Sequence, residues 1–257
     1  MEIIILGSGS AYGTPYAGNF FGSADKNNDK NIRLRPSAYF KDGEDAFLIE
    51  CGPDFRQQTC IHNINKIDNI FLSHGHADHI MGIWELTRFS KMMKAPINIF
   101  GNEATIKEVK ERFSFMFKDG FKEMGDGGVI LNIIKPYQDL KLPKTDLTIK
   151  TLNFIHKKQE ILGFKYKNMV YTPDVAEIPE ETKPYLENLD LWIFECDSFE
   201  DAKKGHNYLD QALKWINEFK PKRCILNHLN VTIDYNSVSK LLPSNTELAY
   251  DGMIVKI

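Results

Sequence analysis

The segment FLSHGHADHIMGI, residues 71–83, holds three histidines and one aspartate within six positions, from His74 to His79. Imidazole nitrogens and carboxylate oxygens are ligands that Zn²⁺ and Mn²⁺ accept. In an extended segment His74 and His76 project to the same side and can hold one ion together. Asp78 and His79 point away from that pair and suit a second ion. Four ligands cannot complete two metal sites, so further ligands must come from elsewhere in the chain.

Three further ligand-type side chains end strand-like runs in the later part of the chain. LTIKTLNFIH ends at His156, NMVYTPD ends at Asp174 and RCILNH ends at His228. Sites on sheet scaffolds are commonly built where strands end. Each residue alone is more typical of a structural histidine or of a turn. Their coincidence with the histidine-rich segment makes them candidate ligands.

The elements that must position these residues are mostly short apolar runs of strand length. They cover residues 2–6, 37–40, 46–49, 69–72, 97–100, 129–133, 147–152, 162–166, 168–171, 191–194, 223–226, 247–249 and 253–256. The Asp251-Gly252 dipeptide predicts a hairpin between the last two. Helical spacing appears at 83–93, 103–113 and 208–219. Strand runs interspersed with helices predict a single domain over residues 1–257, an α/β fold built as a four-layer αββα sandwich.

The composition is that of an ordinary globular protein, with 42% hydrophobic residues and a formal net charge of −3. A slightly acidic chain has no general attraction for nucleic acid or for an anionic membrane, so a small-molecule partner is expected. The four cysteines form no CxxC pair, which argues against a zinc knuckle or a disulfide scaffold. No window approaches the roughly 20 apolar residues of a membrane span, and the N-terminus lacks signal-peptide features. We expect a cytoplasmic protein.

Two segments lack a regular pattern. Residues 12–36 form a long polar loop after the first strand. Residues 114–128, SFMFKDGFKEMGDGG, combine aromatic residues and methionine with four glycines. This second segment could be a surface excursion, a mobile flap over a pocket, or a contact in a homodimer.

The sequence resembles a known superfamily over essentially its whole length. SHGHADH, followed in order by His156, Asp174 and His228, resembles the metallo-β-lactamase fold superfamily of dinuclear hydrolases. LGSGSAYGTP at the start, RLRPSA at 33–38, IECGPDFRQQ at 49–58 and AYDGM at 249–253 narrow the resemblance. They are similar to the phosphonate-pathway branch, whose characterised member is a phosphoribosyl cyclic phosphodiesterase.

The resemblance implies two divalent metal ions, zinc or manganese. The first would be held by His74, His76 and His156, the second by Asp78, His79 and His228, and both by the bridging Asp174. GHNYLDQAL at 205–213 resembles the segment that carries a further catalytic histidine, which corresponds to His206. Asn207 is the expected N-cap of the helix that follows. His62 has no counterpart in the pattern and is given no role.

The loop at 12–36 departs from the branch. Members commonly carry cysteines there that hold a structural zinc, and this loop contains no cysteine. We therefore expect no structural zinc, and a loop that is either held by packing of Phe20 and Phe21 or partly disordered.

The implied reaction is hydrolysis of a small phosphodiester, cyclic or phosphoribosyl in type. Two ions roughly 3.5–4 Å apart can share a bridging hydroxide that attacks phosphorus in line. Asp78 and Asp174 would act at the metal centre, and His206 would protonate the leaving alkoxide.

Two alternatives remain open. A transfer-RNA 3′-processing endoribonuclease shares the ligand pattern and the style of the opening motif. It would need a basic arm, whereas residues 114–128 carry two lysines against three acidic residues. The other alternative is a metal-binding accessory protein of cofactor biosynthesis, against which the full set of seven ligands argues.

Overall fold

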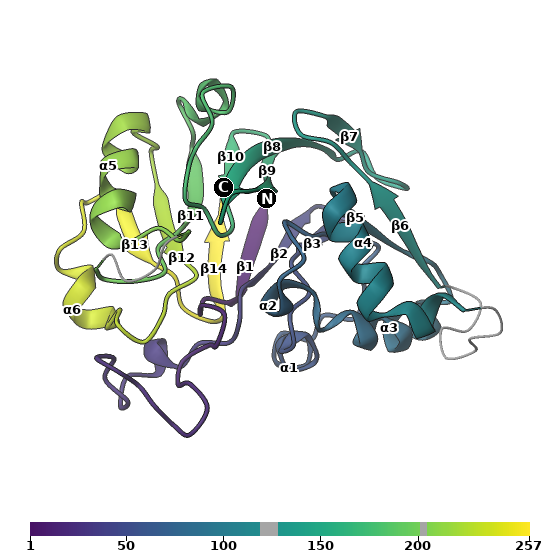
Figure 1. Cartoon of the computed structure of the whole chain (residues 1–257), viewed down its shortest axis with the longest axis horizontal. Coiled ribbons are helices and arrows are strands. Elements are labelled where there is room, and N and C mark those ends of the chain that lie inside the picture. Colours follow the sequence, from purple (N-terminus) through teal and green to yellow (C-terminus); the bar gives the residue numbers. More distant parts are fainter. Residues whose placement is uncertain (119–127, 201–204) are drawn as a thin grey trace.

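In the computed structural model, which describes residues 1–118, 128–200 and 205–257, two β-sheets pack face to face with helices on both outer sides (Figure 1). This arrangement confirms the predicted α/β sandwich. It also explains the alternating strand and helix pattern, because each sheet buries one face against the other sheet and one against helices.

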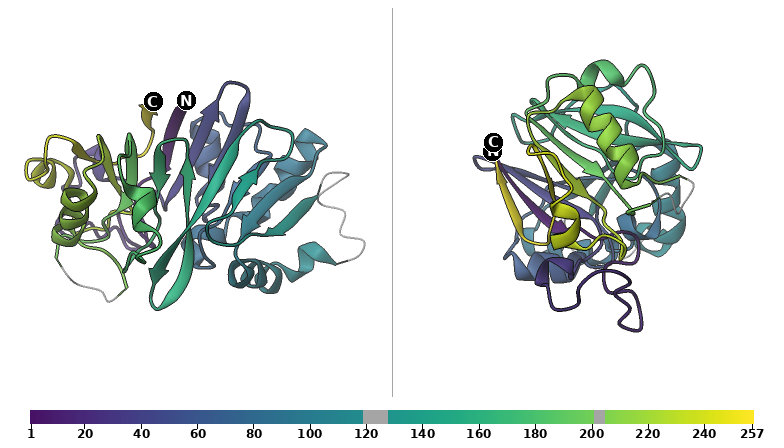
Figure 2. Two further views of the ribbon diagram at one scale, coloured as in Figure 1. Left: turned by 90° about the horizontal axis from the view of Figure 1, so that it is seen from above. Right: turned by 90° about the vertical axis from the view of Figure 1, so that its left-hand side faces the viewer.

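The first sheet contains the amino-terminal half of the fold and the last strand. Its strands in spatial order are β14 (Met253–Lys256), β1 (Glu2–Gly7), β2 (Ser37–Asp42), β3 (Asp45–Ile49), β4 (Asn69–Phe71), β5 (Ile97–Gly101) and β6 (Val129–Ile133). Strands β3 to β6 run parallel to one another, so their carboxyl ends meet at one edge. Strands β1 and β14 are antiparallel, and the amino group of Met1 donates a hydrogen bond to the Ile257 carbonyl at 3.1 Å. The two termini therefore lie side by side (Figure 2).

The second sheet contains the later strands. Their spatial order is β13 (Thr246–Leu248), β12 (Cys224–Asn227), β11 (Leu191–Glu195), β10 (Met169–Tyr171), β9 (Gln159–Tyr166), β8 (Thr148–His156) and β7 (Asp139–Lys141). Strand β8 extends beyond the predicted run at 147–152, because its final residues NFIH also pair with β9, up to His156 and Gln159. The short polar strand β7 carries no apolar alternation and escaped prediction.

The α-helices are α1 (Phe55–Ile61), α2 (Ala77–Ile80), α3 (Leu86–Met93), α4 (Glu103–Arg112), α5 (Leu209–Phe219) and α6 (Tyr235–Ser239). Short 3₁₀ turns are η1 (Asp29–Asn31), η2 (Ile83–Glu85), η3 (Ser114–Phe117) and η4 (Lys183–Leu186). None of the helices in the described part of the chain has the length and apolar content needed to cross a bilayer.

Three apolar cores separate the four layers. One lies between the sheets and includes Phe40, Phe47 and Phe164. Another lies between the first sheet and helices α1, α3 and α4. The third joins the second sheet to α5, whose residues Leu209, Ala212, Ile216 and Phe219 share one buried face at helical spacing. The cores leave the strand ends as the place where polar side chains converge.

The predicted hairpin at Asp251-Gly252 is wrong. Strand β13 pairs in the second sheet and β14 in the first, so the turn carries the chain from one sheet to the other. The buried carboxylate of Asp251 accepts hydrogen bonds from Ser8 N and Ser8 Oγ, both at 2.8 Å, and from Leu34 N at 2.7 Å. These contacts join both ends of the long loop to the turn.

The loop that follows β1 is anchored by a buried polar cluster of Asn31, Arg33 and Asp234, here called the anchor cluster. Asn31 Nδ2 donates to Asp234 Oδ2 at 2.8 Å, and Arg33 donates to Asn31 Oδ1 at 2.8 Å. Arg33 also donates to the carbonyl oxygens of Asn230 and Ile233, at 3.2 and 2.8 Å. The loop is thereby fixed to the segment that follows β12.

The expectation that packing of Phe20 holds this loop is wrong, and the alternative of partial disorder stays untested. Phe20 is 59% exposed, and its ring lies 6.1 Å from that of Tyr16 within the loop. Hydrogen bonds of the anchor cluster and the backbone pair Thr14–Arg33 hold the loop instead. Polar contacts to a segment 200 residues away replace the expected apolar packing.

Candidate metal centre

The histidine-rich segment changes from extended backbone to helix in the middle of its motif. His76 precedes α2 in extended conformation, and Asp78 and His79 lie in the first turn of that helix. The helix is packed so tightly that a Cβ on Gly52 would come within 2.1 Å of the Asp78 carbonyl oxygen. Glycine at position 52 therefore allows the close approach that fixes the two later ligand candidates.

One group of candidate ligands surrounds the Oδ2 atom of Asp174. His74 Nε2 lies 2.8 Å from His76 Nδ1 and 3.9 Å from Asp174 Oδ2. His156 Nε2, from the end of β8, also lies 3.9 Å from Asp174 Oδ2. The four ligand atoms fall within 4.8 Å of one another, close enough to hold one cation.

A second group surrounds the other carboxylate oxygen of Asp174. His228 Nε2 lies 3.0 Å and His79 Nε2 3.4 Å from Asp174 Oδ1. Asp78 Oδ2 lies 3.0 Å from His79 Nε2 and 3.4 Å from His228 Nε2. His228 reaches this position directly after β12 through a left-handed backbone with φ of 62°. Asp174 thus faces a separate group with each of its two oxygens.

The residues present fit a pair of divalent cations. His79 Nε2, His156 Nε2 and Asp174 Oδ1 are buried and have no hydrogen-bond partner of good geometry among the described residues. Unpaired buried polar atoms are costly unless something compensates them. Nitrogen and carboxylate oxygen atoms converging at these spacings are compensated by a metal ion.

Neighbouring groups orient the imidazole rings. The Gly205 carbonyl lies 2.5 Å from His156 Nδ1, and because a carbonyl only accepts, Nδ1 carries the proton and Nε2 keeps its lone pair. Ser73 Oγ lies 2.9 Å from His74 Nδ1, and Glu50 Oε2 lies 3.3 Å from His79 Nδ1. Such outer contacts are typical of histidine ligands.

The two groups differ in their electrostatics. Burial lowers the pKa of His74 and His76 and lowers that of His156 to about 3, so these imidazoles are neutral and able to bind metal. In the second group burial also acts to lower the pKa of His79 and His228, but the surrounding carboxylates outweigh it and raise both. The carboxylates therefore favour positive charge in the second group.

A third group joins the centre through His206. His206 Nδ1 lies 2.6 Å from Glu195 Oε1 and 3.7 Å from Asp174 Oδ2. Glu195 is buried, and its Oε2 accepts hydrogen bonds from Val175 N at 2.5 Å and Asn207 N at 3.3 Å. Burial raises the pKa of Glu195 to about 7, although the hydrogen bond from His206 acts in the opposite direction.

Sequence reasoning missed Glu195. The available signal was a carboxylate ending the otherwise apolar run LWIFE, which forms the fully buried strand β11. The prediction of Asn207 as helix N-cap is also wrong. Tyr208 is the N-cap, and the Asn207 side chain donates instead to the Glu195 carbonyl at 3.1 Å. The Asn207 side-chain amide therefore binds the end of β11 and does not cap the helix.

The remaining sequence expectations fall outside the centre or outside the described residues. His62 ends α1 and borders Gly252, away from the three groups. In segment 114–128, η3 packs against the outer core through Met116, and residues 119–127 lie outside the described residues. Neither the flap nor the homodimer contact is tested by the residues that remain.

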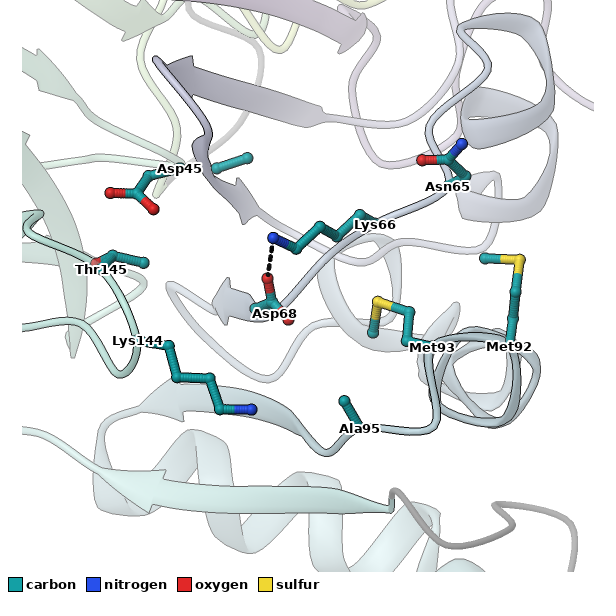
Figure 3. Close-up of a pocket in the computed structure, with 10 residues that line it drawn as sticks. Asp45, Asn65, Lys66, Asp68, Met92, Met93, Ala95, Lys144 and Thr145 are labelled. Carbon is teal, nitrogen blue, oxygen red and sulfur yellow. Dashed lines mark ion pairs between the residues drawn. The ribbon is translucent and has the colours of Figure 1, made fainter.

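A hollow of about 570 Å³ lies at the opposite edge of the first sheet (Figure 3). Its lining includes Lys66 and Asp68, which precede β4 and form an ion pair at 3.3 Å, and Lys144. Since the candidate ligands of the histidine-rich segment follow the carboxyl end of β4, this hollow is remote from them.

Residues 46–229 match the family model described as the β-lactamase superfamily domain, which is more than half of the chain. The chain belongs to the β-lactamase superfamily. This match confirms the predicted fold and the hydrolase class at the level of the superfamily.

Individual relatives narrow the assignment within the superfamily. The crystal structure of a diphosphatase from the PhnP family covers all of this chain and 97% of its own, with a TM-score of 0.89 and 25% identity. This likeness supports the branch that the opening and closing motifs predicted.

Two curated relatives match by sequence. An octanoyltransferase from Porphyromonas gingivalis (strain ATCC BAA-308 / W83) is 25% identical over 98% of this chain, which corresponds to 51% of that protein. A ribonuclease Z from Methanococcus maripaludis (strain C5) is 34% identical over 43% of this chain and 31% of its own length. The chain thus spans about half, or less, of the length of these relatives.

Proposed function

We propose that this chain is a dinuclear metal-dependent hydrolase of small phosphodiesters. The observation that carries the proposal is the position of Asp174, whose two oxygens face separate histidine groups at 3.0–3.9 Å. One cation would be held by His74, His76 and His156, the other by Asp78, His79 and His228, and both by Asp174. Likeness to a PhnP-family diphosphatase favours a phosphorus-centred substrate.

When bound, two divalent ions supply Lewis acidity to phosphoryl oxygens and lower the pKa of a water molecule. The protein contributes orientation and proton handling. Burial acts to lower the pKa of His206, but the hydrogen bond that its Nδ1–H donates to Glu195 and the nearby carboxylate of Asp174 outweigh burial and raise it. The imidazolium form is thereby favoured, and its Nε2–H would supply the proton that the leaving oxygen takes. Glu195 acts through His206 and is a positioning residue.

The choice between zinc and manganese is open on these ligands, because nitrogen and carboxylate donors accept both. The proposal is tested by measuring metal per chain together with hydrolysis of bis(p-nitrophenyl) phosphate by the protein loaded with each metal. Two ions per chain and turnover of the diester support it. One ion and no turnover would favour a metal-binding accessory role.

A ribonuclease Z-type activity is the second candidate, because the chain is 34% identical to such an enzyme over 115 residues. A precursor transfer RNA and bis(p-nitrophenyl) phosphate, assayed side by side, distinguish the two. Cleavage at the 3′ side of the RNA with a turnover far above that of the small diester would replace the first candidate by the second.

The role of His206 has its own test. Replacing His206 with Ala should lower kcat by about 10²–10⁴-fold, the usual contribution of a general acid, with both metals retained. Glu195→Gln should lower kcat less, since the His206 ring stays in place. Loss of the carboxylate that raises the pKa of His206 should shift the basic limb of the pH–rate profile to lower pH. Full turnover in a His206→Ala protein that keeps both metals contradicts the acid role.

A further inference from the structure

A cleft of about 860 Å³ opens onto His74 and His76. Helix α4 forms one wall, and Gln159 and Glu160 at the start of β9 form the other. The hairpin register places Gln159 opposite His156 and Glu160 opposite Ile155, so this wall begins beside a candidate ligand. A group bound to the metal centre through its phosphate therefore has space to extend into this cleft.

The cleft has an excess of negative charge. On α4, Arg112 pairs with Glu108 at 2.8 Å and Lys107 pairs with Glu111 at 3.8 Å, so these four charges largely cancel. Glu103 and Glu160 line the same cleft, and neither has a cation within ion-pair distance in the part of the chain that the structure describes. Two exposed carboxylates are thus the unpaired charges of the cleft lining, while the charge of Lys157, which acts on His76, belongs to the adjoining turn and lies outside that lining.

Glu160 is held in position from two sides. Asn153 Nδ2 donates to its carboxylate Oε1 at 3.3 Å, and Asn102 Nδ2 donates to its backbone carbonyl at 3.1 Å. The second bond connects the hairpin to the start of α4 and so joins the two walls. Ionised carboxylates only accept hydrogen bonds, and they repel anions.

We infer that this cleft holds the arm of the substrate beyond its phosphate, and that Glu103 and Glu160 select an arm that donates hydrogen bonds and carries no negative charge. Hydroxyl and ammonium groups both meet this requirement. A polynucleotide does not, because its neighbouring phosphates would lie against the two carboxylates. The inference rests on the proposed function and specifies its substrate class.

The experiment uses p-nitrophenyl phosphodiesters that differ only in the second arm, which is glyceryl, 2-aminoethyl or 2-carboxyethyl. For the metal-loaded protein, we expect kcat/KM for the carboxyethyl ester to be at least about 10-fold below that of the better of the other two, through KM. The ranking of the glyceryl and aminoethyl esters identifies which donor the cleft prefers. In the double variant Glu103→Gln, Glu160→Gln, this difference in kcat/KM between the esters should shrink to about threefold or less.

Glu44→Gln is the control, since it makes the same kind of substitution once, at the exposed β2–β3 turn outside the cleft, and should keep the full difference in kcat/KM between the esters. Metal content and melting temperature verify that the double variant is folded and loaded. An unchanged difference in that variant, with bis(p-nitrophenyl) phosphate still hydrolysed, overturns this inference and leaves the proposed function standing. Hydrolysis of none of the esters overturns both.

Discussion

Two buried polar clusters of this molecule differ in how far their own side chains satisfy one another's hydrogen-bonding atoms. In the anchor cluster, Asn31 lies between a carboxylate that accepts from it and a guanidinium that donates to it. In the candidate metal centre, the Nε2 atoms of His79 and His156 converge on Asp174 without forming hydrogen bonds of good geometry. Burial of polar groups is tolerated when most of them satisfy one another, and bound cations would compensate the unpaired atoms that converge at the candidate metal centre.

The difference separates a structural role from a chemical one. The anchor cluster ties the loop after β1, which contains no cysteine, to the segment after β12 through hydrogen bonds. In the candidate metal centre, the unpaired nitrogen and oxygen atoms would be compensated only when cations bind. The two clusters are therefore expected to respond differently to the same kind of substitution.

The largest effect is expected for Asp174→Ala. Loss of the carboxylate that faces both histidine groups should reduce bound metal from two ions to at most one. It should also lower kcat by at least about 10³-fold, because bound ions contribute several kcal/mol of transition-state stabilisation. Elemental analysis and diester hydrolysis check both parts. A variant with two ions and parental turnover would mean that the two groups do not share this residue.

Asp234→Ala should produce the complementary result. Its removal leaves the Asp25 and Ser237 N–H groups without their acceptor, reduces the acceptors of Asn31 Nδ2 to the Asp25 carbonyl and leaves Arg33 with less compensation. The free energy of unfolding should therefore fall by about 2–4 kcal/mol. Metal content should remain that of the parent protein. Urea unfolding and elemental analysis give the two readings, and a loss of metal without a loss of stability would contradict the division between the clusters.

The smallest effect concerns Asp251, which joins both ends of the anchored loop. Burial raises its pKa to about 6, although hydrogen bonds from Leu34 and Ser8 act to lower it. Between about pH 4 and pH 6 the folded state then binds more protons than the unfolded state, so stability falls as the pH rises through this range. The expected loss is of the order of 1–3 kcal/mol.

Asp251→Asn cannot ionise and should lack this step. Urea unfolding gives the free energy of unfolding of both proteins at pH 4 and pH 7. The difference between parent and variant is compared at the two pH values, so that contributions from other groups cancel. Parallel behaviour of the two proteins would show that Asp251 does not titrate in this range.

The residues that the structure brings together as a candidate metal centre could be found in the sequence because they carry strong local signals. The HxHxDH spacing is compact, and His156, Asp174 and His228 each lie at or near a strand end, so proximity followed from the layered fold. Glu195 gave almost no signal, because a glutamate at the end of a strand becomes important only when His206 packs against it.

The anchor cluster could not be predicted for a related reason. Asn31 and Asp234 are separated by about 200 positions, and their pairing depends on how β1 and β12 are placed in different sheets. The hairpin prediction at Asp251-Gly252 failed for the same reason. The dipeptide specifies a tight turn, but tertiary packing decides which sheet the following strand joins. Local chemistry could be read from the sequence, whereas long-range hydrogen bonds required the structure.

The pairing of β1 with β14 has a practical consequence for protein engineering. Met1 and Ile257 are neighbours in one antiparallel pair, while the far end of β1 leads to Ser8, which bonds the Leu229 backbone next to His228. Six residues of strand, about 20 Å, thus separate the termini from the metal centre. A short linker can close the ends into a circle, and new ends can be opened at the exposed β2–β3 turn. The chain is therefore well suited to circular permutation and to immobilisation through either end with the cleft left open.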